Sequence, residues 1–120
     1  MSEDRPVSVS LENRLMSNGY YVTAYEETAD RITLTYEAVS ESETVTSHEV
    51  GVVVRTLLAI EDERDDWEPG RLEVTSTTTD GAVRGHWHVE EAWFRGLSEG
   101  LSAPEFSERV LETIRAPSQE

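Results

Sequence analysis

Two histidines in the C-terminal half have a spacing that suits metal binding. His86 and His88 flank Trp87, so in an extended strand both imidazoles lie on one face, because side chains alternate between faces. Pairing with the preceding strand places Glu73 opposite His88. Two imidazoles and a carboxylate, with positions left open for water, are ligands that zinc or nickel accepts. The sequence predicts a candidate metal site at His86, His88 and Glu73. A solvated strand face with a cross-strand glutamate–histidine pair explains the same residues.

The acidic run at 62–66 invites comparison with a calcium-binding loop. Asp62 and Glu73 stand at the first and twelfth positions of such a loop. The third position is Arg64, however, and the sixth, where the sharp turn requires glycine, is Trp67. We therefore interpret this run as a charged, solvated connection.

Motifs for covalent catalysis or phosphate binding are absent from the chain. No serine stands in a Gly-x-Ser-x-Gly elbow, and the glycines lack the spacing of a phosphate-binding loop. The sequence therefore favours a protein without catalysis, for which zinc is the one cofactor hypothesis.

The charge composition is extreme. The chain has 25 acidic and 10 basic residues, a net charge of −15, and every basic residue is arginine. Molar salt shortens the Debye length to about 3 Å and screens the self-repulsion of such a surface. Arginine is also less strongly hydrated than lysine. We expect a halophile protein that requires high intracellular salt. Nucleic acid is disfavoured as a partner, because phosphate binding depends on cations. The one cationic patch that the sequence predicts is formed by Arg71 and Arg84, on the same side of the second hairpin.

Length and composition indicate a single domain over residues 1–120, with disordered tails at 1–7 and 116–120. The chain has no cysteine, so disulfides are excluded. It shows neither a signal peptide nor a stretch approaching the roughly 20 apolar residues of a membrane span. We expect a cytoplasmic protein that does not bind membranes.

The most apolar stretch, Val45–Ile60, predicts a central helix. Thr46 and Glu49 have the spacing of a capping box, in which each side chain bonds the other residue's backbone N–H. Around this helix, periodicity and turn signals predict a short first helix, two hairpins and two C-terminal helices, with boundaries near Asn18-Gly19, Tyr20, Ile32–Ala38, Arg71–Val89, Gly100 and Ser102.

Turn chemistry predicts the register of the second hairpin. A two-residue turn at Asp80-Gly81 brings two apolar pairs onto the buried face, Leu72 with Val89 and Val74 with Trp87. The opposite face receives the pairs Glu73–His88, Thr75–His86 and Thr77–Arg84. In the first hairpin, strict alternation places Tyr20, Val22 and Ala24 on one face and Tyr21, Thr23 and Tyr25 on the other.

The expected fold class is α+β. Two α-β-β units form a four-stranded antiparallel sheet with helices packed on one face, and the chain ends in two C-terminal helices. The element order also resembles the secretion-chaperone architecture, a fold-level analogy that implies dimerisation and partner binding.

Two resemblances concern the C-terminal half. The segments GHWHVEEAWF, from Gly85, and GLSAPEFSERVLETI, from Gly100, resemble a family of small haloarchaeal proteins of unknown function. Separately, the stretch from Leu97 to Leu111 is similar to short helical C-terminal domains of prokaryotic proteins. Neither resemblance implies a catalytic residue.

The leading functional hypothesis is a non-catalytic protein–protein interaction module, whose partner is another protein or a second copy of the chain. The alternative is a metal- or small-ligand-binding protein that uses the exposed face of the second hairpin, with His86, His88 and Glu73.

Overall fold

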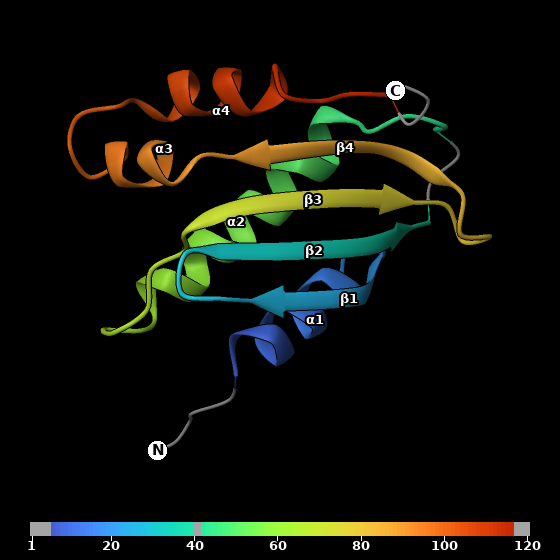
Figure 1. Ribbon diagram of the computed structural model, residues 1–120, viewed down its shortest axis with the longest axis horizontal. Coiled ribbons are helices and arrows are strands. Elements are labelled where there is room, and N and C mark those ends of the chain that lie inside the picture. The colour runs from blue at the N-terminus through green and yellow to red at the C-terminus, as the bar shows by residue number, and fades with distance from the viewer. Residues whose placement is uncertain (1–5, 40–41, 117–120) are drawn as a thin grey trace.

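The chain folds into a four-stranded sheet with helices behind one face and along one edge (Figure 1). The computed structural model describes residues 6–39 and 42–116. Within them the predicted order of elements is confirmed: α1 (Val7–Met16), β1 (Tyr20–Glu27), β2 (Arg31–Ala38), α2 (Ser47–Asp62), β3 (Arg71–Thr77), β4 (Val83–Val89), α3 (Glu91–Gly96) and α4 (Ala103–Leu111).

The predicted tails lie mostly outside the described residues, which leave out 1–5 and 117–120. Val7 is an exception. It is the first residue of α1 and is buried, so Val7 does not belong to the disordered tail expected over residues 1–7.

The sheet is mixed rather than purely antiparallel, so this part of the predicted fold class is wrong. The strands lie in the order β1-β2-β3-β4, and the hairpins β1/β2 and β3/β4 are antiparallel, but the central pair β2/β3 is parallel. The cause is the connection through α2. Its 16 residues span about 24 Å, close to the roughly 26 Å of the eight-residue β2, so the helix returns the chain to the end where β2 began.

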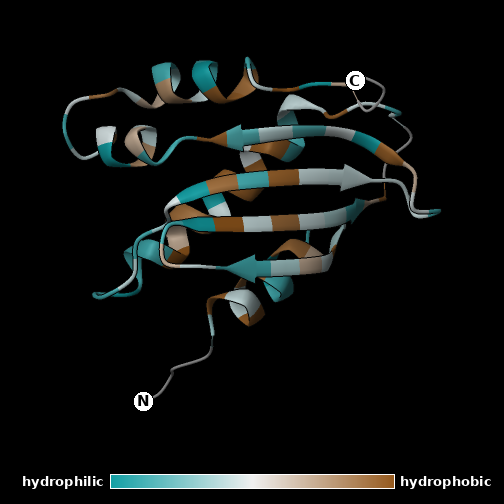
Figure 2. Ribbon diagram, in the orientation of Figure 1, coloured by the Kyte–Doolittle hydropathy of each residue, from teal (hydrophilic) through white to brown (hydrophobic). Residues whose placement is uncertain are grey.

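Helix α2 covers the inner face of the sheet, as its apolar pattern predicts. Val53, Leu57 and Ile60 are fully buried, and the predicted capping box is present, with Thr46 Oγ1 accepting from the Glu49 N–H at 3.2 Å. Figure 2 shows the alternation of apolar and polar residues along β2 and β3. The strands contribute the opposite wall of the core: Ile32, Leu34, Tyr36, Ala38, Leu72, Val74, Trp87 and Val89.

A β-bulge changes the facing of β1. Val22 pairs with Tyr36 and Ala24 pairs with Thr35, so Thr23 is the extra residue. Beyond it, Tyr25 pairs with Leu34 and packs against the core, whereas Ala24 is exposed. The strict alternation predicted for this strand is therefore wrong after Val22.

Both edges of the sheet are protected against pairing with another chain. On the β4 side the segment after α4 forms a bridge, in which Arg115 N–H donates to His86 O at 2.8 Å and His86 N–H donates to Arg115 O at 3.0 Å. On the β1 side the bulge and the exposed carboxylates of Glu26 and Glu27 break the regular edge.

Candidate functional site

The three residues of the predicted metal site line one shallow hollow of about 190 Å³, on the sheet face that carries no helix. The register there is the predicted one, with Glu73 opposite His88 and Thr75 opposite His86. The complete lining is Thr33, Arg71, Glu73, Val74, Thr75, His86, Trp87, His88 and Arg115.

The carboxylate of Glu73 is already held by arginines. Arg71 Nε donates to it at 2.8 Å and Arg31 Nη1 at 3.4 Å. The hydrogen bond from Arg71 is the main reason why the pKa of Glu73 lies below its usual value. This carboxylate therefore acts first as an ion-pair partner of Arg71.

The two histidines also have individual partners. His86 Nδ1 lies 3.1 Å from the Thr75 hydroxyl, and His88 Nε2 lies 3.3 Å from a Glu90 carboxylate oxygen. The His88 ring stacks on Trp93 with centroids 6.0 Å apart. In the part of the chain that the structure describes, no three histidine, aspartate or glutamate side chains gather in a geometry that holds a metal ion. The zinc hypothesis stays a prediction.

Arg84 lies in the interior, so its predicted place on the exposed face beside Arg71 is wrong. The turn has three residues rather than two: the Thr78 N–H donates to Ala82 O at 2.7 Å, and Gly81 adopts φ +93°. Thr77 consequently pairs with Val83. Arg84 becomes the extra residue of a bulge, and its side chain turns to the core face, where it is 1% exposed.

The buried guanidinium of Arg84 is fully engaged. Its Nη1 lies 2.9 Å from both carboxylate oxygens of Glu49 and donates to Ser76 Oγ at 2.7 Å. Its Nε and Nη2 donate to the backbone carbonyls of Ser42, at 3.0 Å, and Thr44, at 2.7 Å. This pairing ties the start of α2 to β4 and to the connection before α2, which is a structural role.

Tyr36 completes this interior network. Its hydroxyl donates to Glu49 Oε2 at 2.6 Å, and burial together with the nearby Glu49 charge raises the pKa of the phenol. Glu49 also accepts the Thr46 N–H of the capping box at 3.1 Å. Because the carboxylate already accepts from Tyr36, Thr46 and Arg84, it serves as a structural anchor rather than as a general base.

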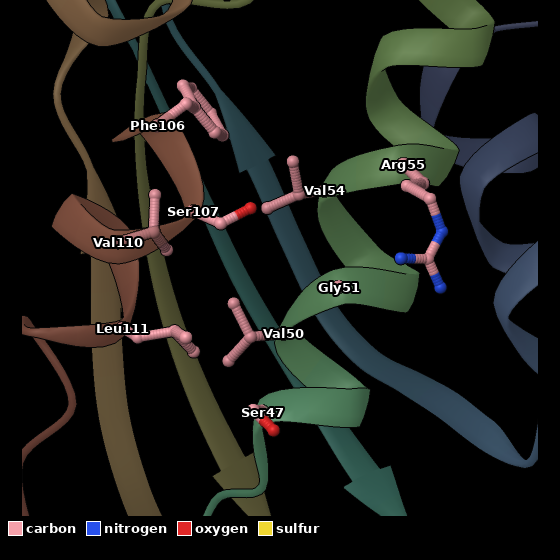
Figure 3. A pocket seen from close by; sticks show the side chains of 9 residues that line it. All are labelled: Ser47, Val50, Gly51, Val54, Arg55, Phe106, Ser107, Val110 and Leu111. Atoms are coloured by element: carbon pink, nitrogen blue, oxygen red, sulfur yellow. The ribbon is translucent and has the colours of Figure 1, made fainter. Parts of the chain in front are cut away.

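A second concave surface lies between α2 and α4 (Figure 3). We call it the α2–α4 groove; its volume is about 180 Å³. Figure 3 shows Val50 and Val54 of α2 facing Phe106, Val110 and Leu111 of α4. The rest of the lining is Ser47, Gly51, Arg55 and Ser107.

Arg55 is the charged residue of the α2–α4 groove. It is exposed, and its guanidinium makes no hydrogen bond or ion pair within the described residues. The side chain folds back along α2, so that a Cβ added at Gly51 would lie 2.9 Å from its Nη1. Figure 3 shows the guanidinium on the side of α2 that is turned away from Phe106, Val110 and Leu111.

Sequence reasoning missed both the groove and the interior pair. Apolar periodicity indicates which face of one helix is buried, but it carries no information on the gap that remains between two helices. For Arg84, the available signal was Gly81, since a three-residue loop with glycine last is also a common hairpin connection.

The fold and its surfaces define a small α+β protein with a mixed four-stranded sheet, helices on one face, and surface hollows that include the α2–α4 groove and the hollow on the helix-free face. The chain belongs to the family described as Domain of unknown function (DUF8159), whose model matches residues 1–120. No curated protein and no solved structure matches it. Within the described residues, no helix combines the length and apolar character needed to span a bilayer.

Proposed function

We propose that this protein is a non-catalytic interaction module of the halophile cytoplasm, which binds an apolar side chain of a partner protein in the α2–α4 groove. The observation that carries the proposal is the groove itself, walled by Val50 and Val54 on one helix and by Phe106, Val110 and Leu111 on the other. Val50, Val54, Phe106 and Val110 are only 1–7% exposed, so the groove is a narrow apolar cleft that a side chain of the partner has to widen.

The size of the groove favours a side chain over a cofactor. Pockets that enclose drug-sized ligands have volumes of roughly 300–1,000 Å³. The groove has about 180 Å³, which suits one or two aliphatic or aromatic side chains. Helix-in-groove recognition uses such anchors, inserted from one face of an amphipathic segment.

The sheet edges are poorer candidates for the same role. The β4 edge is covered by the backbone of Arg115, and the β1 edge carries a bulge and two glutamates. Association through added strands, which requires a regular unpaired edge, is disfavoured on both sides. A partner would therefore approach through the helical layer.

Arg55 defines the chemistry of the partner further. At molar salt the Debye length is about 3 Å, so the net charge of the chain hardly acts beyond direct contacts. Ion pairs at the contact surface therefore decide which partner segment binds. A partner segment that continues from the groove across α2 would meet the Arg55 guanidinium, which has no ion-pair partner within the described residues, and this favours a carboxylate next to the apolar anchor. The occupant is thus an apolar residue followed by aspartate or glutamate.

The test is a titration of the full-length, isotope-labelled protein in molar KCl with a synthetic amphipathic peptide. The peptide carries leucines at i and i+4 and a glutamate beside them; a second version carries lysine instead of glutamate. We expect saturable amide shifts at Val50, Gly51 and Leu111, and tighter binding of the glutamate version. Ser107→Trp, which fills the groove, should abolish binding, and Arg55→Gln should remove the preference between the peptides.

The matched control is Ser17→Trp, an equal change at an exposed position after α1. It should leave binding unchanged. Shifts outside the groove, or equal weakening by both tryptophan variants, would contradict the proposal. Sedimentation supplies a second check: self-association that Ser107→Trp alone abolishes would assign the groove to a second copy and overturn the proposed occupant.

A further inference from the structure

We infer that the hollow on the helix-free face of the second hairpin binds a small oxyanion, with Arg115 and His86 as its principal contacts. This inference is independent of the α2–α4 groove, because no residue lines both. It assigns to the hollow an anion rather than the metal cation predicted from the sequence.

The geometry begins with a row of three residues across neighbouring strands. Thr75 pairs with His86 in the β3/β4 ladder, and His86 pairs with Arg115 in the antiparallel bridge. Directly opposed residues in antiparallel pairs project from the same face, with Cβ atoms about 5 Å apart. The side chains of His86 and Arg115 therefore leave the helix-free face from neighbouring positions, and both residues line the hollow.

The hydrogen bond to Thr75 orients the imidazole. Thr75 Oγ1 lies 3.1 Å from His86 Nδ1, which leaves Nε2 without a hydrogen-bond partner among the described residues. When the threonine hydroxyl donates to Nδ1, the proton of the neutral ring resides on Nε2 and becomes a donor. His86 can then donate this N–H to an anion in the hollow that it lines together with Arg115.

The acidic side chain nearest to the hollow is paired with another arginine, which leaves the guanidinium of Arg115 available to bind an anion. Glu73, the acidic residue of the lining, is bound by Arg71, which also donates to Glu90 at 2.7 Å. Arg115 is exposed and makes no side-chain hydrogen bond or ion pair within the described residues. In a chain with 25 acidic residues, an arginine without a carboxylate partner, set in a polar hollow, is a binding group for an added anion.

The same arrangement disfavours a divalent cation. Arg71 and Arg115 both line the hollow and repel positive charge. Glu73 would have to leave Arg71 before it could bind a metal. An oxyanion meets neither obstacle, and a volume of about 190 Å³ accommodates a phosphate or a small carboxylate.

Phosphate and carboxylate oxygens share the chemistry that a guanidinium fork recognises. The experiment therefore has two arms, in which inorganic phosphate or acetate is titrated into the full-length protein in KCl. The readouts are the ring signals of His86 and the backbone amide of Arg115. We expect a saturable joint shift in at least one arm; the tighter-binding arm identifies the source of the oxyanion.

Variants test the assignment. Arg115→Gln should weaken binding at least about tenfold, because a charge-assisted hydrogen bond is lost, and His86→Gln should also weaken it. Arg109→Gln is the matched control, since it removes an exposed arginine of α4 that does not line the hollow and changes the net charge equally. The bridge of Arg115 uses backbone atoms, so Arg115→Gln should fold normally. No saturable shift in either arm, or equal weakening by Arg109→Gln, would overturn the inference.

Discussion

Arg84 Nη1 lies 2.9 Å from both carboxylate oxygens of Glu49, and each side chain is only 1% exposed. The pair joins the bulge of β4 to the first turn of α2, two segments 35 residues apart in the chain. Tyr36, Ser76 and two backbone carbonyls add further hydrogen bonds, so groups of the protein itself compensate both charges.

Removing one partner of this pair should destabilise the fold strongly. Arg84→Met leaves the Glu49 carboxylate buried without its cation, and we expect the free energy of unfolding to fall by about 3–5 kcal/mol. Denaturant unfolding in KCl measures the loss. Arg95→Met is the control, because its pair with Glu91 is half-exposed and should contribute at most about 0.5 kcal/mol. A loss below about 1 kcal/mol for Arg84→Met would refute the anchoring role.

Glycine at position 51 should make the folded protein less stable than alanine would. It lies inside α2, and an added methyl group would meet only the flexible end of Arg55, at 2.9 Å. Gly51→Ala should raise the free energy of unfolding by about 0.5–1 kcal/mol through helix propensity, and should weaken peptide binding because it displaces Arg55. Thermal unfolding and the peptide titration measure the two effects. Lower stability together with unchanged binding would contradict both the helix argument and the groove.

Glu61 should destabilise the folded protein at neutral pH. Burial, followed by the charges of Glu68 and Asp62, raises its pKa above the usual value. A carboxyl group whose pKa is higher in the folded state than in the unfolded state stabilises the fold when it is protonated, below the unfolded-state pKa of about 4.3. This stabilisation is lost as the pH rises through the folded-state pKa. Glu61→Gln should therefore stabilise the protein by some tenths of a kcal/mol at pH 7 and by nothing below pH ~4.

The control for Glu61 is Glu12→Gln, which removes one exposed carboxylate from α1. Unfolding curves at several pH values, in dilute and in molar KCl, separate the two. The gain from Glu61→Gln should shrink in salt, because screening weakens the repulsion by Glu68 and Asp62. An equal gain from Glu12→Gln would attribute the effect to net charge alone.

Removing salt should loosen the whole structure. A net charge of −15 over 120 residues opposes compaction when the Debye length is long, and molar KCl screens that repulsion. We expect the midpoint of thermal unfolding to rise steadily from dilute buffer to molar KCl. Equal stability at both extremes would contradict the halophile interpretation.

Zinc distinguishes the two hypotheses for the second hairpin. The sequence hypothesis predicts that Zn²⁺ shifts the ring signals of His86 and His88 together, and that Glu73→Gln weakens the effect. The oxyanion proposal predicts no saturable joint shift, because Arg71 already holds Glu73 and Arg115 repels the ion. Titration at high salt, with the signals of the exposed His48 as reference, decides between them.

Local sequence signals predicted much of this architecture. The pairs from Leu72–Val89 to Thr75–His86 match the prediction although the predicted turn is wrong, because the bulge at Arg84 offsets the extra residue of the loop. The capping box of α2, the helix stop at Gly19 and the order of elements follow from contacts within a few residues. Such features depend on backbone N–H groups, turn geometry and alternation, so neighbouring residues suffice to specify them. The placement of His86 and His88 on one face was predictable from alternation alone, whereas the position of Glu73 opposite His88 also depends on the bulge at Arg84.

The tertiary structure decided the rest. The parallel pairing of β2 and β3 depends on where α2 returns the chain. The bulge at Thr23 shifts the faces of the residues that follow it in β1, and the bulge at Arg84 turns that side chain to the core. Both surfaces proposed here arise between distant segments: α2 with α4, and the β3/β4 hairpin with Arg115. Sequence specifies periodicity within a segment, whereas the space between packed segments is set by the volumes and charges that meet there.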